Sequence, residues 1–257
     1  MKARTATAAL LPALLLGAAG CASEDTPASA KDPDPKGSVS TPGRSAPAGP
    51  VGTPAPAGSG AAATPERAGG RLQRSALEQG DLPGYQISAA GKNPNAPDGQ
   101  PQADRKACQP LADIMGDKPD PAARETVNRG VGSQKQMGLA VSASVSSYAE
   151  PHAKALIARL KAAVAACPTG FTATVEKQSG AYREVKAADY QTAGDESISW
   201  TTTASAEGVT AQVHLVVVRQ GDTVVRLMAL NVAGGRQAPQ VPHEVADKQL
   251  QKVRDAR

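Results

Sequence analysis

The stretch ESISWTTTASAEGVTAQVHLVVVRQGDTVVRLMALNV, residues 196–232, decides the fold of this chain. Apolar and polar residues alternate through most of it, as they do in half-buried strands. Two dipeptides, EG at 207–208 and GD at 221–222, interrupt the alternation and have the composition of two-residue hairpin turns. The stretch therefore predicts three consecutive antiparallel strands.

Turn length fixes the expected pairing of these strands. With two-residue turns, Trp200 lies opposite Leu215, and Val217 lies opposite Arg226. One face is then the core face, with Ile198, Trp200, Val213, Leu215, Val217, Met228 and Leu230. The opposite face has an apolar end, with Val216, Val218, Val225 and Leu227. Its polar end carries Ser199, Thr201, Thr203, Gln212, His214 and Asn231.

Flanking segments add helices and further strands. Apolar residues recur at helical spacing after Leu72, over 103–116, over 150–167 and over Pro242–Arg254. Alternating patterns predict strands at Tyr85–Ser88 and Gly138–Tyr148, whereas residues 117–132 resemble irregular structure. The expected fold class is α+β: an antiparallel sheet of about four to six strands, with helices packed on one face.

The N-terminus has the layout of an export signal. Two positive charges within Met1–Arg4 precede an apolar run of thirteen residues, 7–19, which is too short to span a bilayer. The sequence AAGC at 18–21 resembles the lipobox of bacterial lipoproteins, which implies a signal peptide over 1–20 and a lipid on Cys21. The alternative is a secreted protein with a chance cysteine at this position.

A low-complexity segment follows Cys21. Residues 22–70 are rich in Pro, Ala, Ser, Gly and Thr and contain no aromatic residue, so they cannot bury enough apolar surface to fold. We expect a lipidated, disordered tether over 21–71 and one folded domain over 72–257. The tether would hold that domain on the extracytoplasmic face of the cell membrane.

Cys108 and Cys167 remain once Cys21 is assigned to the lipid. Both fall on the inward stripe of a predicted helix, in an exported domain where disulfides persist. The sequence therefore predicts one disulfide between them, with two buried free thiols as the alternative. A metal site would need further clustered ligands, which the sequence does not supply.

No catalytic motif stands out. The carboxylates of GDES at 194–197 fit a turn and strand entry, and VNRGVGSQ at 127–134 lacks phosphate-loop spacing. A net charge of +4 without a basic cluster gives no reason to expect nucleic acid as a partner. We expect a non-catalytic protein with no cofactor and no metal.

The order of several segments resembles a known family. SVSSYAEPHAKALIARLKAAVAAC (144–167), GDESISW (194–200), HLVVVRQGDTVVRL (214–227) and Q..KV (249–253) are similar to the PknH-like extracellular sensor domain of actinobacterial kinases and lipoproteins. The resemblance implies a sensor or ligand-binding module with an antiparallel sheet, helices and an open cleft. Some members carry two disulfides, whereas this chain can form only one. It also carries no kinase domain.

The leading hypothesis is a lipid-anchored, non-catalytic sensor or ligand-binding lipoprotein of the cell envelope. The polar end of the second sheet face is the candidate surface, because convergent hydroxyls and amides suit a small molecule, glycan or peptide. That surface could also be an ordinary solvent-facing one. The alternatives are a protein-interaction partner of a membrane or cell-wall assembly complex and, third, a cryptic hydrolase.

Overall fold

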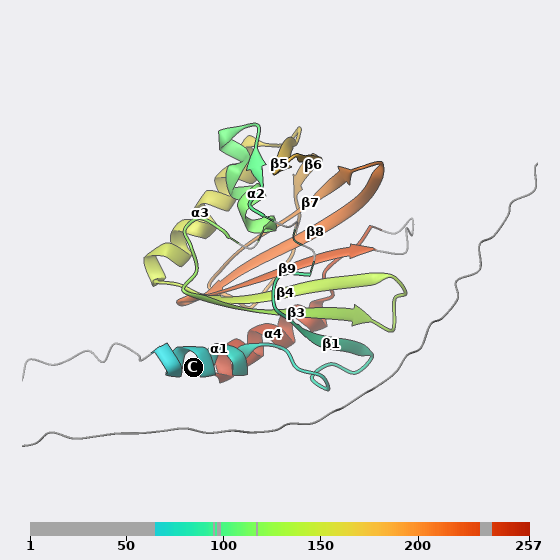
Figure 1. The fold of residues 1–257 in the computed structure, drawn as a ribbon. Coiled ribbons are helices and arrows are strands. Elements are labelled where there is room, and N and C mark those ends of the chain that lie inside the picture. The colour runs from blue at the N-terminus through green and yellow to red at the C-terminus, as the bar shows by residue number, and fades with distance from the viewer. Residues whose placement is uncertain (1–64, 95, 97–98, 117, 232–237) are drawn as a thin grey trace, which may run out of the picture. The chain divides into compact units, whose positions relative to one another are not determined.

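The computed structural model describes residues 65–94, 96, 99–116, 118–231 and 238–257. Its nine strands form a single antiparallel sheet in the order β1-β3-β4-β9-β8-β7-β6-β5-β2 (Figure 1). The strands are β1 (Tyr85–Ala90), β2 (Gln102–Ala103), β3 (Glu125–Ser133), β4 (Leu139–Ser147), β5 (Phe171–Val175), β6 (Gln178–Ala187), β7 (Glu196–Ala206), β8 (Val209–Gln220) and β9 (Thr223–Asn231). The helices are α1 (Pro65–Ser75), α2 (Gln109–Met115), α3 (Glu150–Ala166) and α4 (His243–Asp255), with a short 3-10 turn, η1 (Lys106–Cys108).

The predicted register of the central hairpins is confirmed. Trp200 pairs with Leu215, and Val217 pairs with Arg226. At the tip between β7 and β8, Glu207 and Gly208 both adopt positive φ, 51° and 80°, as a type I′ turn requires. The two predicted turns thus set which side chains share each face of the sheet.

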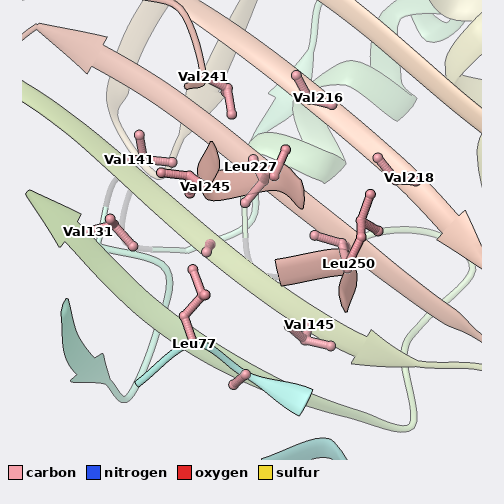
Figure 2. Close-up of a cluster of buried hydrophobic side chains, with 14 of the residues drawn as sticks. Leu77, Val131, Val141, Val145, Val216, Val218, Leu227, Val241, Val245 and Leu250 are labelled. Carbon is pink, nitrogen blue, oxygen red and sulfur yellow. The ribbon is translucent and has the colours of Figure 1, made fainter. Parts of the chain in front are cut away.

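Helices cover both faces of the sheet, so the expectation that they pack on one face is wrong. Helices α2 and α3 lie on the face of Trp200, and α1 and α4 lie on the other (Figure 1). Central strands buried on both sides need apolar residues on both sides. The second face supplies Val216, Val218, Val225 and Leu227, which belong to one buried cluster with Val245 and Leu250 of α4. Figure 2 shows Val216, Val218 and Leu227 beside these two α4 residues.

The sheet is also larger than the predicted four to six strands. Four of its strands, β2, β3, β5 and β6, lie in segments for which no strand was expected. Strand β3 contains Gly130 and Gly132, and β6 is largely exposed and polar, so neither shows clear alternation. Both strands instead owe their conformation to pairing with a more apolar neighbour, β4 or β7.

A disulfide joins Cys108 and Cys167, which confirms the predicted pairing. Both cysteines are fully buried, and the bond links the start of α2 to the residue that ends α3. The two helices over the Trp200 face are therefore tied together covalently.

Helix α1 starts at Pro65, before the residue at which the folded domain was expected to begin. The predicted signal peptide, Cys21 and the predicted tether up to residue 64 lie outside the described residues. Among the helices that are described, none combines the length and apolar character needed to cross a membrane.

One buried amide connects the first helix of the domain to the last. Gln249 of α4 is fully buried; its Nε2 donates to the carbonyl of Ser75, 2.5 Å away, and its Oε1 accepts from the N–H of Leu77 at 3.3 Å. These are backbone groups at the C-terminal end of α1, where a helix leaves carbonyls without partners of its own. Gln249 thereby fixes α1 against α4.

Candidate functional site

Strand pairing brings most of the predicted site residues together. Thr201 lies opposite His214, and Thr203 lies opposite Gln212, on the face turned away from Trp200. Ser199 is on the same face, two residues before Thr201. The predicted polar cluster of β7 and β8 therefore exists as a cluster in three dimensions.

Two of these residues, however, are buried and unavailable to a ligand. Ser199 is 5% exposed and His214 is 2% exposed, and Oγ of Ser199 lies 2.8 Å from Nε2 of His214. The backbone N–H of Val241 donates to Nδ1 of the same ring across 2.9 Å. The segment that enters α4 therefore covers His214, which corrects its expected place on the open surface.

These contacts determine the proton position on His214. A backbone N–H can only donate, so Nδ1 must accept, and the neutral ring carries its proton on Nε2 and donates to Ser199. Burial, together with the neighbouring His243, lowers the pKa of His214 to about 4. The ring is thus a neutral connector between β7, β8 and the α4 segment, and no nucleophile is paired with a free base here.

The remaining residues line an open pocket of about 150 Å³. Thr201, Thr203 and Gln212 form part of its wall from β7 and β8. Another part of the wall is formed by Ala238 and Pro239, which shortly precede Val241, the residue that donates to His214. We call this the Thr201 pocket. Asn231, at the end of β9, is half-buried and is not among the residues that line it.

Strand β6 contributes two charged residues that the sequence did not indicate. Glu184 and Lys186 line the Thr201 pocket and form an ion pair with 3.3 Å between Nζ and Oε2. A β-bulge places them there: the pairing with β7 shifts between Arg183 and Lys186, and Glu184 adopts a φ of 54°. Because the strand itself was not predicted, no sequence signal placed these side chains beside Thr201.

The Thr201 pocket presents hydroxyl, amide, carboxylate and ammonium groups to solvent. This set can donate and accept hydrogen bonds but contains no histidine or thiol. Across the described ranges, no three His, Cys, Asp or Glu side chains converge as they would around a metal ion. The arrangement can hold a polar ligand through hydrogen bonds and opposite charges.

Comparisons with known proteins identify a family. A family model described as the PknH-like extracellular domain matches residues 57–248, which include all nine strands and the Thr201 pocket. Comparison with curated proteins finds no match.

Two solved structures are similar to this chain, each at 12% sequence identity. One is the extracellular domain of PknH from Mycobacterium tuberculosis, with a TM-score of 0.45, covering 73% of this chain and 95% of that one. The other is an uncharacterised protein from Mycobacterium smegmatis, with a TM-score of 0.38, covering 73% of this chain and 93% of that one.

Proposed function

Because this chain belongs to the PknH-like extracellular domain family, and its domain is therefore extracytoplasmic, we propose that it is a lipid-anchored, non-catalytic lipoprotein that binds a ligand at the cell envelope. Lipidation of Cys21 would hold the domain at the outer face of the membrane, since two acyl chains make a stable anchor. The ligand site is the Thr201 pocket.

One observation carries the proposal: polar side chains from three strands converge on an open pocket beside a buried, inert His214. Thr201, Thr203 and Gln212 supply uncharged hydrogen-bonding groups, and the Glu184–Lys186 pair supplies both charges. Small-molecule sites use few, well-placed polar groups of this kind. The supported ligand is a small polar molecule, either a sugar or a short peptide.

A binding screen with the purified full chain in detergent tests this. The probes are a set of cell-wall oligosaccharides and short peptides, with affinity measured by calorimetry. The double variant Thr201→Val and Thr203→Val keeps side-chain shape and removes both hydroxyls. The affinity of this variant for the probe that binds should be lower by about tenfold or more, which corresponds to a loss of roughly 1.4 kcal/mol of binding free energy.

Thr210→Val is the matched control, because Thr210 is an exposed strand residue of β8 that does not line this pocket. This control should bind as the unaltered chain does. Equal affinity in the double variant and the unaltered chain would remove the Thr201 pocket as the site. Capture of one envelope protein, with no probe bound, would favour the protein-partner alternative.

A further inference from the structure

A second recess crosses the opposite face of the same strands, near the tips of their hairpins. Two pockets of about 180 and 200 Å³ share Gly180, Tyr182 and Ala206, so they form one continuous groove, which we call the Tyr182 groove. Together they reach the lower end of the usual volume of small-molecule sites, roughly 300 to 1,000 Å³. The Tyr182 groove does not include any residue of the Thr201 pocket.

The aromatic ring of Tyr182 in this groove stacks on a second aromatic ring. Tyr182 lies directly opposite Phe171 across β5 and β6, and the two rings stack with centroids 4.9 Å apart and planes 24° apart. Phe171 is buried, which fixes the orientation of the half-buried Tyr182 ring. Beside the ring, Gly180 and Ala206 are small, so they leave room along it.

The hairpin tips give the groove both polar and apolar groups. Gln178 Nε2 donates to Glu207 Oε1 across 3.0 Å, which joins the two tips, and both side chains are exposed. Val209, which pairs with Ala206 beside the same turn, also lines the groove. It is 70% exposed, one of the two most exposed large apolar side chains among the described residues. The groove therefore combines a rigid aromatic, an apolar floor and a polar rim.

We propose that the Tyr182 groove binds a pyranose ring of a polysaccharide. The C–H groups of a pyranose face pack against an aromatic ring, whose face carries partial negative charge. Its hydroxyls need planar donors and acceptors at the rim, and Gln178 and Glu207 provide both in one bonded pair. The floor of small residues admits a flat ring. This site does not depend on the Thr201 pocket.

Titration of the purified full chain with four neutral oligosaccharides tests the proposal. The probes are maltohexaose, cellohexaose, mannohexaose and chitohexaose, and at least one should bind. Gly180→Leu should lower the affinity for that oligosaccharide by about tenfold or more. A Cβ at Gly180 would meet the Ser205 carbonyl at 3.6 Å and Ala206 Cβ at 3.7 Å, which are ordinary contacts, so the added side chain fills the groove without straining the strand.

Four further variants separate the effect of ring stacking from effects on folding and on the Thr201 pocket. Tyr182→Phe keeps the ring and should bind as the unaltered chain does, whereas Tyr182→Ala should lose binding. Gly132→Leu is the matched control: a Cβ there meets only the Gln86 carbonyl at 4.0 Å, away from the groove. The Thr201→Val and Thr203→Val double variant should also bind normally, which separates this site from the Thr201 pocket. Absence of binding by all four probes, or undiminished binding by Gly180→Leu, would overturn the proposal.

Discussion

The backbone N–H of Val241 donates a hydrogen bond to Nδ1 of His214 across 2.9 Å. This bond attaches the chain segment that begins α4 to the centre of the sheet. Because Ala238 and Pro239 precede Val241 and line the Thr201 pocket, the same bond positions one wall of that pocket.

Acid should weaken this attachment. Protonation would place an N–H of His214 against the N–H of Val241, and burial and His243 lower the pKa of His214 to about 4, from 6.5. Between pH 6.5 and 4 the unfolded chain then binds more protons than the folded one. The free energy of unfolding should therefore fall as the pH drops through this window, by roughly 3 kcal/mol. Urea unfolding at a series of pH values measures it.

His214→Gln is the control for this prediction, because its amide oxygen can accept from Val241 and its amide nitrogen can donate to Ser199 without titrating in this range. The decrease in the free energy of unfolding between pH 6.5 and 4 that comes from His214 should occur only in the unaltered chain. The carboxyls of Asp81, Asp222 and Glu244 have lowered pKa values and affect both chains alike, chiefly at lower pH. Equal losses in both chains would refute the assignment to His214.

Removing the disulfide should destabilise the domain. Cys108 and Cys167 are separated by 59 residues, for which the chain-entropy model gives roughly 4 kcal/mol. The variant with both cysteines changed to Ala should unfold at a correspondingly lower urea concentration. The single tryptophan, Trp200, is fully buried and reports the transition by fluorescence. A reducing agent should destabilise only the unaltered chain, and an unchanged midpoint in the variant would contradict the prediction.

Gln249→Leu should lower the free energy of unfolding by more than a surface substitution on the same helix does. It removes the partners of the Ser75 carbonyl and the Leu77 N–H, and each buried group left unsatisfied costs roughly 1 to 3 kcal/mol. Gln251→Leu, on the exposed face of α4, makes the same change where no such bonds are lost. We expect urea unfolding to separate the free energies of unfolding of the two variants by roughly 2 to 6 kcal/mol. Equal stabilities would show that Gln249 does not fix α1.

Cys21→Ser should abolish lipid attachment. Intact-mass measurement of the membrane fraction should find the unaltered mature chain beginning at Cys21 and carrying a diacylglyceryl group, and the variant without it. Cys108→Ser should retain the lipid, because that cysteine lies within the folded domain. An unaltered chain without lipid, or one that begins elsewhere, would contradict the anchoring proposal.

The central part of the fold was predictable because local sequence determines it. Two-residue turns fix the register of β7, β8 and β9, and register fixes which face Trp200 and Leu215 share. The register thus depends on spacing within one short segment. The cysteine pairing was predictable for a different reason, since only Cys108 and Cys167 remain once Cys21 is assigned to the lipid.

Features that depend on distant segments could not be predicted. Ser199 and His214 belong to a polar strand face by alternation, yet the entry to α4, including Val241, buries them. Glu184 reaches the Thr201 pocket only through a bulge with positive φ, in a strand whose own pattern is weak. Sequence alternation indicates which face a side chain occupies, but it does not indicate what covers that face.

The contact between α1 and α4 would have a mechanical consequence if the domain is tethered on its N-terminal side, as we propose. Tension arriving at Pro65 would act on α1, which belongs to no strand of the sheet. It would first oppose the Gln249 bonds and the ion pair between Arg71 and Asp222, 3.0 Å apart. Because Asp222 lies in the turn between β8 and β9, and α1 also contacts β3 and β4, the same force would reach the sheet through these contacts. Separation of α1 would expose the apolar surface against which Leu72 and Leu77 pack.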